Sequence, residues 1–173
     1  MDPRDEFLSS TMGAMDLVYN IARRMERSPE DARDLVQDTY LSAFSAWTKG
    51  SKPDRVEPWL ATICLNLGRS RYRRSRRALR EVPLELARGA VDRSDPESEA
   101  LASLDAAALH QAMWTLDEGQ RIALALVDIC GLSTTEAAQV MGTPRGTVLS
   151  RLHRGRRALA HVMSEHVDRG EPF

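Results

Sequence analysis

Arginine is the residue type best placed to do chemistry in this chain of 173 residues, and it is concentrated in two blocks that contain no acid. Seven arginines lie between Arg69 and Arg80, and five lie between Thr143 and His161. Guanidinium groups bind the phosphate oxygens of nucleic acids. The formal net charge of the chain is only −1, so these blocks predict two separate nucleic-acid-binding surfaces on an otherwise nearly neutral protein.

Residue types that carry catalysis or bind metals do not cluster in this sequence. The two cysteines, Cys64 and Cys130, each lie in an apolar run and form neither a CxxC pair nor a metal-ligand cluster, so we expect buried thiols in a reducing cytosol. No histidine has paired carboxylates beside it, and no glycine-rich phosphate loop is present. The sequence therefore predicts a protein that is no enzyme and has no catalytic residue, cofactor or metal site. The four histidines are scattered, at His110, His153, His161 and His166.

The hydropathy of the chain predicts a cytoplasmic protein without membrane insertion. Its longest apolar stretches are much shorter than a membrane-spanning helix requires. Its first residues are acidic and polar, and lack the order of charged and apolar segments that a signal peptide has.

The elements that position the arginines are predicted to be helices. Helix-forming residues dominate, and no alternating run of Val, Ile, Thr and Tyr has the length of a strand. An acidic stretch with two prolines and weak periodicity separates the two halves of the chain. These patterns predict an all-α protein of two small helical domains joined by a linker, the second domain containing a helix-turn-helix. We place the domains at residues 1–80 and 96–173, and the linker at residues 81–95.

The first domain is expected to contain three amphipathic helices. Apolar residues recur every three to four positions over residues 7–27, as in one continuous helix. A second helix is capped by Ser28 and ends near Trp47. A third begins near Glu57, and Gly68 within it predicts a kink or a short break before the arginine block.

The second domain is expected to contain four helices, the last two forming the helix-turn-helix. The first of the four is expected to follow Asp95. Ser133 and Glu136 form a capping box at the start of the third helix, which ends at Gly142. Thr143 is the predicted cap of the last helix. A short helix, a tight turn and a longer basic helix are typical of a helix-turn-helix.

The last helix has an apolar stripe and a basic face. The stripe recurs at intervals of four, three, four and three residues, at Val148, Leu152, Gly155, Leu159 and Val162. The amino end of such a helix contacts base edges in the major groove, and later positions contact phosphates. A merely solvated basic helix is the alternative, but the capped helix before it and the absence of acids favour DNA binding. The opposite face holds Arg145, Thr147, Ser150, Arg151, Arg154 and Arg157.

A family resemblance rests on three stretches of sequence. Residues 116–159, LDEGQRIALALVDICGLSTTEAAQVMGTPRGTVLSRLHRGRRAL, resemble the promoter-binding carboxy-terminal region of extracytoplasmic-function sigma factors. DARDLVQDTYLSAFSAW and PWLATICLN resemble the amino-terminal region of the same family. Three positions depart from the family pattern: Leu149 replaces a common Lys or Arg, Asp117 a common proline, and Ser70 a frequent aspartate.

The resemblance implies an alternative sigma factor, the subunit that directs bacterial RNA polymerase core to particular promoters. Its implied partners are the core polymerase, promoter DNA and an anti-sigma factor. Polymerase docking is implied for Asp34, Gln37 and Asp38, although acids near a helix amino terminus also complement the helix dipole.

The resemblance also implies two sets of DNA contacts. In the first domain, the residues that would hold the melted strand and the upstream promoter element are Asn66, Arg69, Arg71, Tyr72, Arg73, Arg74, Arg76 and Arg77. Within this set Tyr72 is a candidate for base stacking, and Asn66 either bonds a flipped base or caps a loop. In the helix-turn-helix the implied contacts are Arg145, Thr147, Leu149, Ser150, Arg151, His153, Arg154 and Arg157.

Two other functions fit part of the sequence. A sigma-like decoy or adaptor would bind an anti-sigma factor without DNA, and would not need basic surfaces. A helix-turn-helix transcriptional regulator would need neither the first arginine block nor the acidic stretch DLVQD. The presence of both basic blocks together with that stretch favours the sigma factor.

Overall fold

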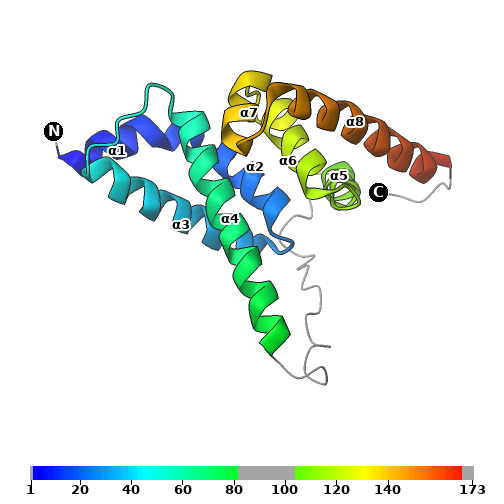
Figure 1. The fold of residues 1–173 in the computed structure, drawn as a ribbon, viewed down its shortest axis with the longest axis horizontal. Helices are drawn as coiled ribbons and strands as arrows, with labels where there is room; N and C mark the ends of the chain where they lie inside the picture. Colours follow the sequence, from blue (N-terminus) through cyan, green and yellow to red (C-terminus); the bar gives the residue numbers. More distant parts are fainter. Residues whose placement is uncertain (1, 82–103, 169–173) are drawn as a thin grey trace. The chain divides into compact units, whose positions relative to one another are not determined.

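The computed structural model describes residues 2–81 and 104–168, and every regular element within these two ranges is helical (Figure 1). The prediction of an all-α protein is therefore confirmed. The chain divides into two compact units, Met1–Ser94 and Asp95–Phe173. The predicted linker and the helix start expected after Asp95 lie outside the described residues. No helix in the described ranges is long and apolar enough to cross a membrane.

The described part of unit 1, residues 2–81, contains four α-helices and one short turn of 3₁₀-helix. Its elements are α1 (Pro3–Thr11), η1 (Met12–Ala14), α2 (Met15–Met25), α3 (Pro29–Thr48) and α4 (Val56–Glu81). The single helix predicted over residues 7–27 is wrong, because η1 separates α1 from α2. Gly13 favours this break as a poor helix former, and the Thr11 hydroxyl donates a hydrogen bond back to the Phe7 carbonyl (2.7 Å).

The core of unit 1 lies between α2, α3 and α4, which pack against one another. Ile21, Leu35 and Leu60 come from the three helices and are completely buried. The predicted cap of α3 is confirmed, since the Ser28 hydroxyl oxygen accepts a hydrogen bond from the Asp31 amide (3.0 Å).

Gly68 lies inside a continuous α4, so the predicted kink or break is wrong. A Cβ atom at this position would lie 2.6 Å from Sδ and Cε of Met25 and 3.3 Å from a methyl carbon of Leu35. The missing side chain therefore allows α4 to approach α2 and α3 closely. Gly68 therefore serves close helix packing and does not end the helix before the arginine block.

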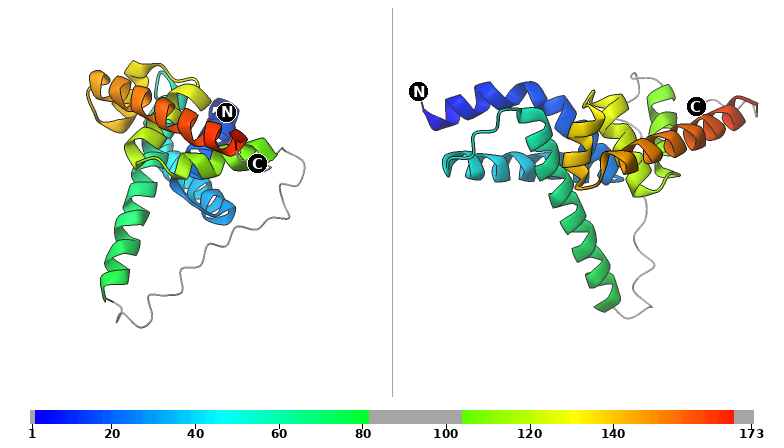
Figure 2. Two further views of the ribbon diagram at one scale, coloured as in Figure 1. Left: turned by 90° about the vertical axis from the view of Figure 1, so that its right-hand side faces the viewer. Right: turned by 45° about the horizontal axis from the view of Figure 1, so that its top comes forward.

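The carboxyl-terminal part of α4 extends beyond α2 and α3 (Figures 1 and 2). Residues 72–77 are all exposed, in contrast to the buried Leu60, Cys64 and Leu65 in the first half of the helix. We call residues 72–77 the α4 arm.

Unit 2 contains α5 (Leu104–Trp114), α6 (Glu118–Leu124), the π-helical segment η3 (Ala125–Ile129), α7 (Thr134–Met141) and α8 (Arg145–Asp168). Asp117 caps α6, because its carboxylate accepts a hydrogen bond from the Gln120 amide (2.9 Å). Arg121 belongs to the core: it is buried, donates a hydrogen bond to the Leu116 carbonyl (3.0 Å) and lies 4.0 Å from the centre of the Trp114 ring.

The turn between α7 and α8 confirms most of its sequence prediction. The capping box of Ser133 and Glu136 is present, and Gly142 ends α7 in the left-handed conformation with φ of +63°. The predicted cap by Thr143 is wrong, because its hydroxyl is buried without a hydrogen-bond partner. Instead, the amides of Thr147 and Val148 donate to the Pro144 carbonyl.

Candidate functional site

The direction of every side chain on the first half of α8 is determined by packing against the rest of unit 2. Val148 is completely buried, and Leu152 is 2% exposed. A Cβ atom at Gly155 would lie 3.0 Å from Cδ1 of Leu124, so this glycine lets α8 approach α6 closely. The predicted buried stripe is therefore present at these three positions. Thr147 is half-buried, and the exposed residues among the predicted contacts are Arg145, Leu149, Ser150, His153, Arg154 and Arg157.

Two of the five arginines in the second block are held by other residues of unit 2. Arg145 donates from Nε to the Thr134 hydroxyl (2.8 Å). Arg156 donates two hydrogen bonds to the Asp128 carboxylate (3.0 and 2.6 Å). These bonds and the charge of Asp128 raise the pKa of the Arg156 guanidinium.

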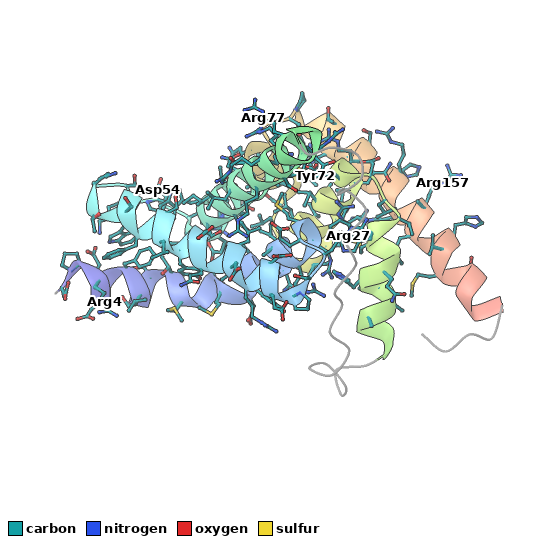
Figure 3. The ribbon with its side chains drawn as sticks, turned by 90° about the horizontal axis from the view of Figure 1, so that it is seen from below. Arg4, Arg27, Asp54, Tyr72, Arg77 and Arg157 are labelled. Carbon is teal, nitrogen blue, oxygen red and sulfur yellow. The ribbon has the colours of Figure 1, made fainter. Side chains whose placement is uncertain are left out.

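The remaining arginines of α8 differ in their freedom. Arg151 is half-buried beside Gly119, where a Cβ atom would lie 2.8 Å from Nε of the arginine. Arg154 is exposed and makes a long bond (3.4 Å) to the carbonyl of Ser150 in its own helix. Arg157 is exposed and points away from α8 (Figure 3). Arg154 and Arg157 are thus the cations most available to a ligand on this helix.

The α4 arm carries a cluster of exposed arginines. They are Arg73, Arg74, Arg76 and Arg77, and Arg77 points outward from the helix (Figure 3). Tyr72 is 59% exposed, and the guanidinium of Arg76 lies 5.9 Å from the centre of its ring. An exposed ring among cations can stack on a nucleic-acid base. Two further predicted residues lie before the arm: Asn66 is exposed and Arg69 is half-buried.

Arg71 differs from the arginines of the α4 arm, because it is tied to α3 and lies near Glu26, the residue that follows α2. Its guanidinium forms an ion pair with Asp38 and donates to the Asp31 carbonyl (3.3 Å). A second carboxylate, that of Glu26, lies 3.9 Å away. Burial raises the pKa of Glu26, the charge of Arg71 opposes this shift, and the charge of Asp31 adds to it.

The predicted docking residues lie together on the exposed side of α3. Asp34, Gln37 and Asp38 are all exposed and follow one another at the spacing of a helix face. The side chains of Asp34 and Gln37 make no hydrogen bond or ion pair with other described residues, whereas Asp38 pairs with Arg71. Asp38 and Arg71 were predicted to have separate roles, and the fold brings them into contact.

One residue of this face was missed from the sequence. Leu41 is 62% exposed. It lies one helical turn after Gln37 and two turns after Asp34. Leu41 is seven residues after Asp34, and this spacing of two helical turns could have placed it on the same face from the sequence alone. Its exposed side chain adds an apolar group to this otherwise polar face.

Groups of ligands suited to a metal ion do not occur in the described parts of the chain. Of the two cysteines, Cys64 is buried and Cys130 is half-buried.

Comparison with protein families finds two matches. Residues 14–78 match the model of sigma-70 region 2, and residues 106–159 match the model of sigma-70 region 4. The first match spans α2 to the α4 arm, and the second runs from within α5 to residue 159 of α8.

Relatives of known function are similar over most of this chain. The ECF RNA polymerase sigma factor SigE of Mycolicibacterium smegmatis is 35% identical over 152 residues, which are 87% of this chain and 59% of that protein. The chain therefore spans less than two thirds of the length of this relative. The ECF RNA polymerase sigma factor EcfG of Rhodopseudomonas palustris is 31% identical over 170 residues, 98% of this chain and 88% of that protein.

Solved structures share the fold. The sigma factor RpoE of Bartonella quintana, in complex with the anti-sigma factor NepR, has a TM-score of 0.80 at 24% identity and covers 92% of this chain and 97% of its own. CnrH in complex with the cytosolic domain of CnrY has a TM-score of 0.62 at 26% identity and covers 94% and 96%.

Proposed function

The chain belongs to the ECF group of RNA polymerase sigma factors, and from this premise we propose that it directs bacterial RNA polymerase core to a particular set of promoters. The observation that carries the proposal is the surface of α8. In the first turns of this packed helix Arg145 is bonded to Thr134 and the other exposed residues are uncharged, whereas the exposed arginines Arg154 and Arg157 lie further along. This order matches base contacts followed by phosphate contacts. RNA synthesis is then carried out by the polymerase.

The proposed polymerase-docking surface is the exposed side of α3. Two carboxylates, an amide and an exposed leucine at helical spacing can pair with the cations and cover the apolar side chains of a partner helix. Asp34 and Gln37 are available for this without any rearrangement of unit 1. The docking residues are therefore Asp34, Gln37, Asp38 and Leu41.

The proposed role of the α4 arm is to hold single-stranded promoter DNA after melting. Its exposed arginines can follow the phosphate backbone, and Tyr72 offers a ring to a base. Arg71 is assigned a positioning role, because it ties the start of the arm to α3. Asn66, exposed on α4 before the arm, remains a candidate for a base contact.

A second protein that restrains the sigma factor is the remaining proposed partner. CnrH, 26% identical in its solved structure, is bound there to the cytosolic domain of CnrY. We infer that this chain also binds a regulatory protein of the anti-sigma class. The decoy and the stand-alone regulator are less well supported, since the chain combines two basic surfaces with an acidic face on α3.

Run-off transcription with core polymerase on a library of randomised promoters tests the proposal. Initiation at a defined promoter set should depend on this chain. Gln37→Ala should lower the affinity for core polymerase, and Arg154→Ala should lower promoter affinity while core binding stays as in the wild type. Asp38→Ala is a poor choice, because it also releases Arg71. Core polymerase that starts at the same sites with and without the chain would contradict the proposed function.

A further inference from the structure

Leu149 is a large exposed apolar residue on the helix proposed to enter the major groove. It is 44% exposed, while Val148 beside it and Leu152 one turn later are buried. Its side chain therefore contributes little to the core of unit 2. An exposed leucine at this position needs a partner other than the rest of unit 2, or it remains in water.

The surroundings of Leu149 on α8 contain one cation, Arg145, whose Nε is already bonded within unit 2. One turn earlier lie Arg145, which is bonded to Thr134, and Gly146, where an added Cβ atom would meet no atom within 4 Å. The open space at Gly146 leaves room beside Leu149 for the edge of a base. Five residues of these first turns are exposed: Arg145, Gly146, Leu149, Ser150 and His153.

The exposed arginines without a partner on another helix lie further along α8 than these first turns. Arg154 and Arg157 are one and two turns further along α8 than Ser150. In a helix-turn-helix, the amino end of the second helix contacts base edges and later residues contact the backbone. Leu149 is therefore placed among the residues that face bases.

The chemistry of the major groove restricts what an exposed leucine can recognise. Base edges there present hydrogen-bond donors and acceptors, and the C5 methyl group of thymine is the apolar exception. A leucine over a donor or acceptor would remove that group from water without replacing its hydrogen bond, which is unfavourable. We propose that Leu149 recognises a thymine of the promoter through this methyl group. The inference rests on the proposed promoter binding by α8 and adds its chemical specificity.

Replacement of thymine by deoxyuridine removes only the methyl group and tests the inference directly. The probe is the promoter that gives the strongest initiation in the randomised library, bound by holoenzyme made from the full chain and core polymerase. Each thymine of its upstream element is replaced in turn. Wild-type holoenzyme should bind about fourfold more weakly at one or two positions, the factor expected for one buried methyl group. Leu149→Ala should bind the thymine and deoxyuridine duplexes equally.

Two further variants separate specificity from damage to the fold. Leu8→Ala changes a leucine of similar exposure (37%) on α1 and should keep the wild-type sensitivity to deoxyuridine. Leu149→Lys should shift the preferred base at the same position from thymine to guanine, whose major-groove edge accepts hydrogen bonds. Leu149→Ala should also keep the wild-type salt dependence, because leucine releases no counterion.

The outcomes distinguish this inference from the proposed function. Equal wild-type binding to thymine and deoxyuridine at every position would overturn the inference, as would discrimination that survives in Leu149→Ala. In both cases promoter-specific initiation would still stand. If holoenzyme selects no promoter from the library, the proposed function fails and this inference with it, before any thymine has been replaced.

Discussion

The two basic surfaces differ in how their helices are held. The first half of α8 is packed through Val148, Leu152 and Gly155, so its outward side chains have fixed directions. The α4 arm extends past its neighbours, and all its residues are exposed. A helix with a fixed orientation suits contacts to particular base edges, whereas an exposed arm with arginines suits the backbone of a flexible strand.

The internal pairs of the two surfaces also differ. Arg145 and Arg156 on α8 bond to Thr134 and Asp128, which lie outside the proposed docking surface. Arg71 on α4 instead pairs with Asp38, a residue of the proposed docking face. The proposed docking and strand-binding surfaces are therefore adjacent in unit 1, whereas the arginine pairs of unit 2 involve no residue of the proposed docking surface.

The largest expected effect concerns the independence of the two units. Leu152→Ala removes a buried side chain from unit 2 and should lower its free energy of unfolding by about 2–5 kcal/mol. Hydrogen–deuterium exchange, followed peptide by peptide, should show lost protection in the helices of unit 2 only. Leu60→Ala is the reciprocal control and should affect α2, α3 and α4. Equal loss of protection in both units would show that they do not fold separately.

The next prediction compares free and paired arginines of α8. The double variant Arg154→Ala, Arg157→Ala should reduce the slope of log affinity against log salt for duplex promoter DNA by about 1.8, because each lost phosphate contact contributes about 0.9. Arg156→Ala removes the same charge from an arginine bonded to Asp128. Its slope should stay near that of the wild type, and a reduction as large as that of a free arginine would contradict the assignment.

A similar comparison applies to unit 1. Arg74→Ala should reduce the salt slope for single-stranded DNA by about 0.7, the value for one contact to a single strand. Arg71→Ala should leave this slope unchanged and lower the stability of unit 1 by up to about 1 kcal/mol, since its ion pair with Asp38 is partly exposed. Denaturant titration and fluorescence anisotropy measure the two quantities. A smaller slope for Arg71→Ala would return this residue to the DNA-binding set.

The smallest expected effect concerns Glu26. Burial raises the pKa of this carboxyl above its ordinary value of 4.5, so the folded state binds its proton more tightly than the unfolded state does. The contribution of Glu26 to the stability of unit 1 should therefore fall as the pH rises above 4.5, until the folded-state carboxyl is ionised. Glu26→Gln should remove this part of the pH dependence. Unit 2 is the internal control, because its pH dependence should be the same in both proteins.

Much of the fold could be predicted from local sequence patterns. The cap at Ser28, the capping box at Ser133 and the turn glycine Gly142 each depend on residues within one helical turn, and all three predictions are confirmed. Apolar spacing likewise predicted the buried side of α8. Such signals are local because helix hydrogen bonds and caps join residues three or four positions apart.

Predictions failed where the cause was a distant residue. Gly68 looks like a helix break until Met25 and Leu35 are found against it. Thr143 is a residue type that commonly caps helices, but its hydroxyl is buried without a hydrogen-bond partner. Neither environment can be derived from neighbours in the chain, because both depend on how whole helices pack.

The identity of the basic blocks, their helical form and the family resemblance follow from the order of residues along the chain. Which arginines are free does not, because an ion pair forms wherever packing brings opposite charges together. Arg71 meets a carboxylate 33 residues away, and Arg156 meets one 28 residues away. Leu149 illustrates the same limit: its type is plain in the sequence, but only the packing of Val148 and Leu152 turns it toward solvent.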